Sequence, residues 1–147
     1  MSAERVIANL LRIAREDLDG ARVLNTSGNR NAIYLCEQAA EKIIRAVLTS
    51  EKIHAGIRHQ LEEMIDLMPD ENPIKVRLRA LQHLATYATS YRYTTPTGRI
   101  PPDPSRDDVD AAAKEIETIL TEAARRFGVD LDAADKPAAT SAPIRDR

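Results

Sequence analysis

The sequence predicts an all-α protein, an antiparallel up-and-down bundle of four or five helices. The chain of 147 residues is 43% hydrophobic but only 3% aromatic, so its core has to be built from Leu, Ile, Val and Ala, a composition that favours helices over sheets. Apolar residues recur at steps of three and four in several long stretches, which is the helical period. Turn-forming residues separate these stretches closely enough for neighbouring helices to run antiparallel.

The first helix is expected over about residues 3–24. Its inward stripe has helical spacing and consists of Ile7, Leu10, Ala14, Leu18 and Ala21. The segment 25–31, N-T-S-G-N-R-N, interrupts this pattern with turn formers. Gly28 within it suits a left-handed backbone conformation, so the first helix should end just before it.

The second helix, over residues 32–50, carries two organised faces. Its apolar stripe consists of Ile33, Cys36, Ala40, Ile43 and Val47. A second face, at steps of four and three, consists of Tyr34, Gln38, Glu41 and Arg45. Such a polar face is either solvated or the wall of a site, and spacing alone favours the solvated surface because Glu41 and Arg45 form an ordinary i,i+4 pair.

Two further helices are expected over about residues 58–68 and 73–91. The first would bury Leu61, Met64, Ile65 and Met68, and the second Leu78, Leu81, Ala85 and Ala88. Between them, Asn72 can cap a helix, and Pro73 fits a first helical position because its missing N–H costs nothing there.

A fifth helix should follow a proline-rich loop. Residues 93–104 hold four of the eight prolines, which argues against helix or central strand there. Ser105 with Asp108 three residues later suggests an N-cap, and the helix then runs to about Phe127 before Gly128 ends it. We therefore expect one helical domain over residues 1–128 and a disordered tail over residues 129–147, which is rich in Ala, Asp and Pro without an apolar period.

Charge and cysteine content limit the possible partners. The net charge is −2 and the pI is near 5.9, so no global basic field exists to hold duplex nucleic acid. The single Cys36 lies on an apolar stripe and is expected to be a buried free thiol in a reducing compartment. No signal pattern and no apolar run of membrane-spanning length are visible, so a cytoplasmic protein without a membrane partner is expected.

A cluster of tyrosines around an arginine marks a possible ligand site. Tyr91, Arg92 and Tyr93 follow one another where a helix meets the proline-rich loop, and Tyr87 precedes them by one helical turn. A guanidinium that forks onto phosphate beside stacking rings suits a phosphorylated or planar ligand. A helix end with a packed tyrosine and a capping arginine would explain the same residues equally well.

The histidines give little support to a metal site or a nucleophilic triad. Only His59 with Glu62 or Glu63 approaches a metal-ligand spacing, so no metal is expected, and no cofactor motif is present. Arg77, with five residues between it and His83, matches a loose Arg-x(4–6)-His pattern, whereas Arg79 and His83 are i,i+4 neighbours on one helix face. These three residues are the candidates for catalysis, although Arg77 and His83 would not share one face of a regular helix.

Four segments of the chain resemble the HEPN domain (higher eukaryotes and prokaryotes nucleotide-binding). E-D-L-D-G-A-R-V-L at residues 16–24 is similar to its opening motif, and Y-L-C-E-Q-A-A-E-K-I-I-R-A-V-L at residues 34–48 resembles its Gln-Ala-x-Glu-Lys core. H-Q-L-E-E-M-I-D-L from His59 resembles a His-x-Leu segment. The Tyr-Arg-Tyr segment before a Pro-containing loop resembles an Arg-Tyr-Pro segment of the family.

The resemblance implies a helical bundle that often dimerises and holds a nucleotide or phosphorylated ligand. It would gather these ligand-binding candidates into one cleft: Tyr34, Gln38, Lys42, His59, Arg92 and Tyr93. Tyr91 or Tyr93 would supply the ring that stacks on the ligand. It also implies a minimal nucleotidyltransferase as a partner, often in a toxin–antitoxin pair. We expect binding rather than catalysis, because no His follows Arg92 and Pro96 is displaced from the position the family uses.

Two alternatives stay open. One is a metal-independent ribonuclease toxin acting on RNA, in which an arginine stabilises phosphate charge and His83 handles the 2′-hydroxyl proton. The other is a purely structural dimerisation module.

Overall fold

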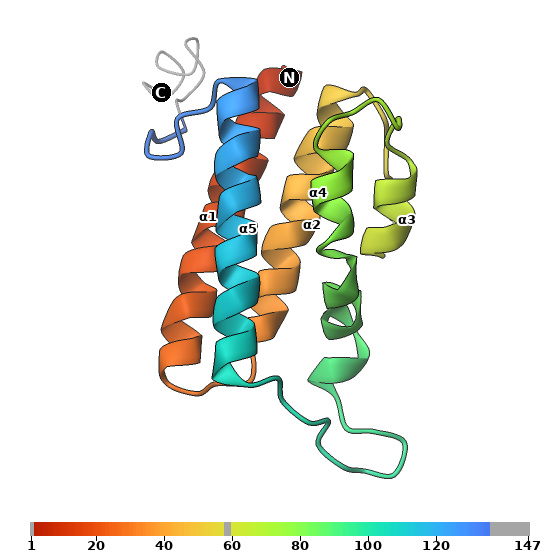
Figure 1. Ribbon diagram of the computed structural model, residues 1–147, viewed down its shortest axis with the longest axis vertical. Helices are drawn as coiled ribbons and strands as arrows, with labels where there is room; N and C mark the ends of the chain where they lie inside the picture. The colour runs from red at the N-terminus through yellow and green to blue at the C-terminus, as the bar shows by residue number, and fades with distance from the viewer. Residues whose placement is uncertain (1, 58–59, 136–147) are drawn as a thin grey trace, which may run out of the picture.

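The structure is a computed structural model that describes residues 2–57 and 60–135. Within that part of the chain every regular element is a helix, so the predicted all-α class is confirmed. The long helices α1 (Ala3–Thr26), α2 (Ala32–Ser50) and α5 (Arg106–Phe127) stand side by side and form the first layer of the bundle (Figure 1).

The boundaries of these long helices follow the expected local chemistry. Ser2 caps α1 by accepting a hydrogen bond from the Arg5 backbone N–H at 3.1 Å, and Ser105 caps α5 by accepting from Asp108 N–H at 3.0 Å. The turn after α1 contains Gly28 at φ +72°, and α5 ends at Gly128 at φ +65°. Both glycines adopt the left-handed conformation that a residue with a side chain seldom adopts.

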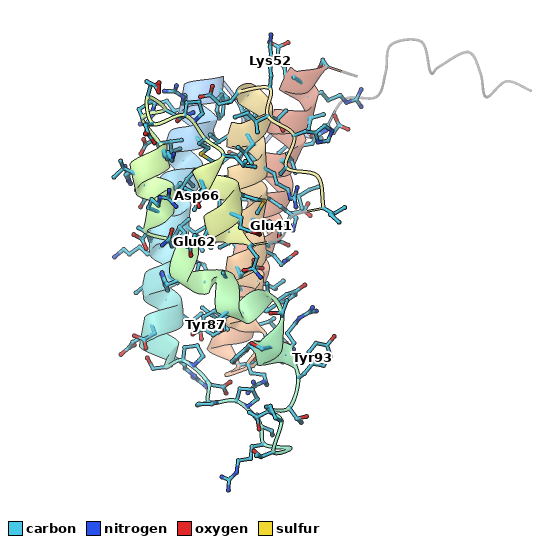
Figure 2. All side chains as sticks on the ribbon, turned by 90° about the vertical axis from the view of Figure 1, so that its right-hand side faces the viewer. Glu41, Lys52, Glu62, Asp66, Tyr87 and Tyr93 are labelled. Atoms are coloured by element: carbon cyan, nitrogen blue, oxygen red, sulfur yellow. The ribbon has the colours of Figure 1, made fainter. Side chains whose placement is uncertain are left out.

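The second layer consists of short elements that pack on the far side of α2. These elements are α3 (Leu61–Asp66), α4 (Lys75–Arg79) and the 3₁₀-helices η1 (Gln82–Ala88) and η2 (Ser90–Arg92). The view of the molecule turned by 90° shows this layer in front of α2, with Tyr93 at its lower end (Figure 2). The α2 helix therefore has α1 and α5 on one side and the short elements of the second layer on the other (Figure 1).

The prediction of one continuous helix over residues 73–91 is wrong. The buried Leu78, Leu81 and Leu84 recur every three residues, a spacing that keeps one side of a 3₁₀-helix inward. Thr86 and Thr89 are β-branched and weak helix formers, and Thr89 leaves the helical region at φ −127° and ψ −84°. The segment accordingly packs its leucines on α2 in short tight turns rather than as an α-helix.

The third predicted helix is also shorter than expected. It begins at Leu61 instead of near residue 58, and Gln60 before it is extended at φ −81° and ψ 118°. Asn72 is not the N-cap of α4, which is Ile74 without a side-chain cap bond; its Oδ1 instead accepts from the Ile74 N–H at 3.0 Å in the turn before α4, while its Nδ2 donates to Glu51 at 2.6 Å. Asn72 thus ties the turn before α4 to the end of α2.

Residues 129–135 continue past α5 and contact α1. Val129 and Leu131 pack against the core, and Arg12 donates to the Asp130 carbonyl oxygen at 3.2 Å. Arg5 and Asp135 form a two-pronged ion pair with both contacts at 3.1 Å. Ordered structure thus extends beyond Gly128, while the part of the predicted tail after Asp135 lies outside the described residues.

No helix in the described ranges is both long and apolar enough to cross a membrane.

Candidate functional site

The polar face of α2 is covered by the second layer instead of being open to solvent. Glu37 is 0% exposed and Glu41 is 8% exposed, while Tyr34, Gln38 and Lys42 are half-buried. Carboxylates are seldom buried to this degree without partners. The interpretation of this face as an ordinary solvated surface is therefore wrong, and its polar groups have to be accounted for individually.

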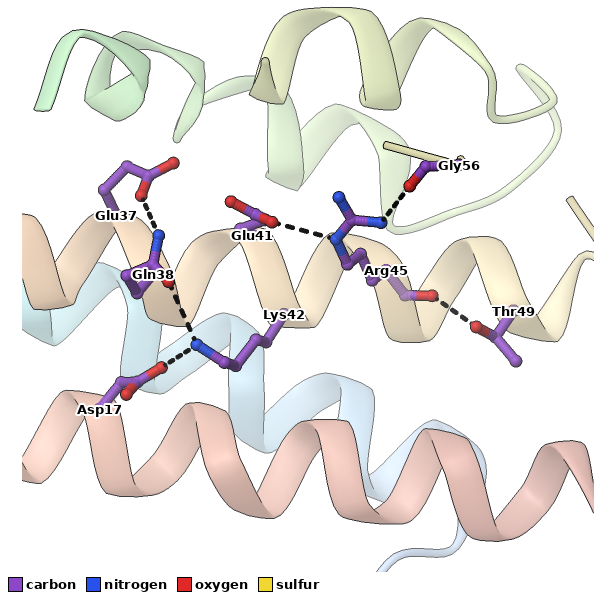
Figure 3. A network of polar contacts seen from close by, with 8 residues as sticks. All are labelled: Asp17, Glu37, Gln38, Glu41, Lys42, Arg45, Thr49 and Gly56. Atoms are coloured by element: carbon purple, nitrogen blue, oxygen red, sulfur yellow. Dashed lines mark hydrogen bonds and ion pairs between the residues drawn. The ribbon is translucent and has the colours of Figure 1, made fainter. Parts of the chain in front are cut away.

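A chain of hydrogen bonds runs across this face from α1 to Glu37. Lys42 Nζ lies 2.6 Å from Asp17 Oδ2 on α1 and 3.5 Å from Gln38 Oε1, and Gln38 Nε2 donates to Glu37 Oε1 at 2.8 Å (Figure 3). These contacts occupy the Lys42 ammonium group and the Gln38 side-chain amide. Lys42 is thus an organiser of the network, and a phosphate would have to compete with Asp17 for its ammonium group.

Glu37 stands at the end of this chain with one oxygen unused. Its Oε2 is buried and has no hydrogen-bond partner among the described residues. Burial raises the pKa of the Glu37 carboxyl to about 7; the negative charge of Glu41 adds to the rise, and the Gln38 hydrogen bond and the charges of Lys42 and Arg92 oppose it. Near neutral pH this carboxyl can therefore accept a hydrogen bond when ionised or donate one when protonated.

Glu41, one turn further along α2, already has a cationic partner. Arg45 Nε donates to Glu41 Oε2 at 3.0 Å, and Arg45 also reaches the Gly56 carbonyl oxygen at 3.4 Å (Figure 3). This pair joins α2 to the connector that precedes α3. Its chemistry is that of a partly buried structural ion pair.

Arg92 covers the other end of the same face. Its guanidinium carbon lies 4.5 Å from the centre of the Tyr34 ring and 5.7 Å from the centre of the Tyr93 ring. Arg92 is exposed, Tyr93 is 66% exposed, and no carboxylate within the described ranges pairs with Arg92. A guanidinium held by its face against a ring keeps its N–H edge available for an anion.

Tyr91 has a different role from its neighbours. It is 5% exposed, and its hydroxyl donates to Asp103 Oδ1 at 2.5 Å and lies 3.1 Å from the Arg30 carbonyl oxygen. Arg30 stacks over the Tyr91 ring at 4.3 Å and also pairs with Asp103 at 2.6 Å. Burial and the neighbouring carboxylate raise the pKa of Tyr91 well above its usual range. Tyr91 thus anchors the proline-rich loop to the α1–α2 turn.

The candidates for catalysis point to different parts of the structure. Arg77 pairs with Glu122 of α5, whereas Arg79 pairs with Asp66 of α3 at 2.5 Å. The His83 ring nitrogen Nδ1 lies 2.9 Å from the Ala80 carbonyl oxygen, and a cavity of about 320 Å³ beside it is lined by Asp108 and Glu115. No described contact joins His83 to either arginine.

His59, the remaining ligand-binding candidate, lies outside the described residues. Of the other candidates, the structure brings Tyr34, Arg92 and Tyr93 together through ring contacts, and Gln38 and Lys42 through a hydrogen bond. Within the described ranges no group of three His, Cys, Asp or Glu side chains could hold a metal ion. We refer below to Tyr34, Glu37, Gln38, Arg92 and Tyr93 as the α2 cluster.

Comparison with known protein families gives a match to the model of the HEPN domain over residues 7–126. The chain belongs to the HEPN family. The match runs from α1 to the end of α5, so it includes both α2 and η2, the two elements that carry most of the α2 cluster in this HEPN protein. Comparisons with curated proteins and with solved structures gave no match.

Glu37 is the residue that sequence reasoning missed in this HEPN domain. Ile33 lies four residues before Glu37, and Ala40 and Ile44 lie three and seven residues after it, all buried. These are the spacings of one helix face, so the sequence does place this carboxylate beside apolar positions.

Proposed function

We propose that this HEPN protein binds a nucleotide, or another phosphorylated ligand, at the α2 cluster. The observation that carries the proposal is Arg92, an exposed guanidinium stacked on Tyr34 without a carboxylate partner among the described residues. Most of the buried or half-buried arginines in the described part are tied to carboxylates, such as Arg30 to Asp103 and Arg45 to Glu41. An arginine kept free beside two tyrosines is suited to a phosphate next to a planar group.

In this proposal each member of the cluster has a separate task. Arg92 binds phosphate through its N–H edge, and the exposed Tyr93 ring supplies a stacking surface. Gln38 and the Lys42–Asp17 pair fix the polar face on α2, so Lys42 supports the site more than it contacts the phosphate. The contact between Arg92 and Tyr34 contributes only about 0.5–1 kcal/mol at an exposed position, so a ligand could displace it readily.

Calorimetric titration with ATP, GTP and CTP tests the proposal. The wild-type protein should bind at least one of them below millimolar concentration, and Arg92→Ala should weaken that binding by about tenfold or more, since a charge-assisted bond to phosphate contributes roughly 1.5–3 kcal/mol. Arg99→Ala is the matched control, because Arg99 is an exposed arginine of the adjoining loop. Absence of binding by the wild type at millimolar nucleotide, or equal losses in both variants, would overturn the proposal.

We further propose that the protein acts as a homodimer with a minimal nucleotidyltransferase of a toxin–antitoxin pair. Membership of the HEPN family supports this, and a groove on α1 lined by Val6, Leu10 and Ile13 offers apolar surface for association. Light scattering of the purified protein, alone and mixed with a nucleotidyltransferase encoded beside it, should give the mass of a dimer and then of a larger complex. A monomer that forms no complex would contradict it.

A further inference from the structure

The unused oxygen of Glu37 indicates what kind of ligand the α2 cluster would select. Glu37 is wholly buried, and its Oε2 has no partner among the described residues even though Oε1 accepts from Gln38 at 2.8 Å. A carboxylate that loses its water without gaining donors is unfavourable, so natural proteins seldom leave one in this state. The described residues thus direct no N–H donor at the Oε2 atom of this carboxyl group.

The carboxyl group belongs to the same surface as Arg92. Tyr34, Glu37 and Gln38 stand at positions i, i+3 and i+4 of α2 and share one face of that helix. Arg92 stacks on Tyr34, and its charge lies close enough to Glu37 to favour the ionised carboxylate. A ligand whose phosphate binds Arg92 therefore has Glu37 on the inner side of the same cluster.

The protein also fixes the orientation of this carboxylate. Asp17 holds Lys42 at 2.6 Å, Lys42 contacts Gln38, and the Gln38 amide donates to Glu37 Oε1, which leaves Oε2 pointing toward the second layer (Figure 3). A side chain held by such a network is already arranged to accept further hydrogen bonds from a ligand.

Base chemistry decides which nucleotide suits this acceptor. Guanine presents two adjacent donors, N1–H and the 2-amino group, to a carboxylate, whereas adenine presents an unprotonated acceptor at N1. An ionised Glu37 can pair with the two guanine donors and is repelled by the adenine N1 lone pair. A site that needs N–H donors rejects analogues that lack them, because its buried acceptor is then left unpaired.

We infer that Glu37 selects guanine nucleotides over adenine nucleotides by accepting hydrogen bonds from the N1–H and the 2-amino group of the base. This inference rests on the proposed function, since it assigns the base to the site where Arg92 would bind the phosphate. Arg92 is exposed at the edge of the cluster, so in this inference the ligand enters beside it and displaces it from the Tyr34 ring.

Calorimetry with GTP, ITP and ATP tests the inference on the full chain. ITP keeps N1–H but lacks the 2-amino group, so the affinity should fall in the order GTP, ITP, ATP, with about tenfold or more between GTP and ATP. Glu37→Gln retains the side-chain shape but replaces the Oε2 acceptor by an amide donor, and it should abolish the preference for GTP. Glu41→Gln, the same change one turn along α2 at a carboxylate paired with Arg45, should preserve the preference.

The pH dependence of the wild-type protein gives a second test that needs no variant. Burial raises the pKa of the Glu37 carboxyl to about 7, and the neighbouring Gln38, Glu41, Lys42 and Arg92 modify that rise, so the ratio of GTP to ATP affinity should rise from about pH 6 to about pH 8. The ratio cancels the titration of the phosphates, which both nucleotides share.

The outcomes separate the inference from the proposed function. If GTP and ATP bind equally tightly, or if Glu37→Gln keeps the preference, the inference is wrong while nucleotide binding stands. If the preference is lost in Glu37→Gln and kept in Glu41→Gln, the inference is supported. If no nucleotide binds the wild type, both fail together.

Discussion

At the scale of single residues, the proposals depend on Glu37 and Arg92. Among the described residues, the Oε2 atom of Glu37 has no hydrogen-bond partner and the guanidinium of Arg92 has no carboxylate partner. Cys36, next to Glu37 in sequence, shows the opposite case. Its thiol is 0% exposed, and burial raises its pKa to about 12, so it behaves as a small apolar core residue. Burial alone is therefore not the reason for choosing Glu37. The proposal rests on its buried Oε2 atom, which has no hydrogen-bond partner among the described residues.

The raised pKa of Glu37 predicts a stability that falls as pH rises. The pKa is 4.5 for an ordinary glutamate and about 7 in the folded protein, so between these values the folded state binds more protons than the unfolded state. The favourable contribution of Glu37 to the free energy of unfolding is therefore largest below about pH 4.5 and is lost as the pH rises through about 7. The loss is on the order of 3 kcal/mol.

Urea unfolding of the wild type and Glu37→Gln at several pH values measures this effect. The variant has no carboxyl to ionise, so its stability relative to the wild type should increase between about pH 5 and about pH 8. Other carboxylates, including Asp70 with its lowered pKa beside Lys75, titrate alike in both proteins and cancel. Parallel pH profiles would show that Glu37 does not titrate in this range.

At the scale of elements, two sets of contacts hold the proline-rich loop and the start of α5 in place. Tyr91 and Asp103 fix the ends of the loop against Arg30 in the α1–α2 turn, and Ser105 starts α5 directly afterwards. These contacts set the position of η2 and hence of Arg92. Loss of the Tyr91–Asp103 contact or of the Ser105 cap should lower the free energy of unfolding more than it changes ligand binding at the α2 cluster.

Tyr91→Phe should destabilise the fold by about 1–2 kcal/mol. The substitution keeps the ring and its edge contact with Tyr87 at 4.9 Å but removes the hydroxyl that bonds Asp103 and Arg30. Tyr93→Phe is the control, because Tyr93 is exposed and no hydrogen bond of its hydroxyl is described; it should change the free energy of unfolding little. Equal effects of the two variants would mean that the Tyr91 hydroxyl is not an anchor.

Ser105→Ala should cost about 1 kcal/mol of stability, because the Asp108 N–H at the start of α5 loses its acceptor. Ser105→Asp keeps an acceptor at the same position and should retain most of the stability, as measured by chemical unfolding. If Ala and Asp were equivalent there, the cap would be shown to be unimportant.

At the scale of the whole molecule, the sequence was sufficient for the first layer and insufficient for the second. The periodic stripes of α1, α2 and α5 and the caps at Gly28, Ser105 and Gly128 could be predicted because each depends on local chemistry. The second layer depends on packing against α2, and weak helix formers such as Thr86 and Thr89 let that packing choose short 3₁₀ turns.

The same cause explains which parts of the site were predictable. Resemblance to the HEPN family predicted that Tyr34 and Arg92 lie together, and the two side chains are in contact, whereas the burial of Glu37 arises only when the second layer covers α2. Tyr91 was grouped with the ligand-binding residues because it adjoins Arg92 in sequence. In the structure its side chain faces Asp103 instead, so sequence proximity was misleading there.

Residues 129–135 should contribute to the stability of the whole domain. A chain ending at Gly128 should be less stable to heat and urea than a chain ending at Asp135, by about 2 kcal/mol, since Val129 and Leu131 would no longer pack on the core and Arg12 would lose Asp130. Identical unfolding curves would show that this segment only rests on α1.

The claim that a nucleotide occupies the α2 cluster is tested most directly by locating a bound nucleotide on the chain. The wild-type protein is irradiated with 8-azido-GTP, and the labelled peptides are identified by mass spectrometry. We predict labelling in residues 34–42 and 90–93, suppressed by excess GTP and lost in Arg92→Ala. Specific labelling elsewhere, for example around the cavity of about 240 Å³ between Arg30 and Arg106, would contradict the account.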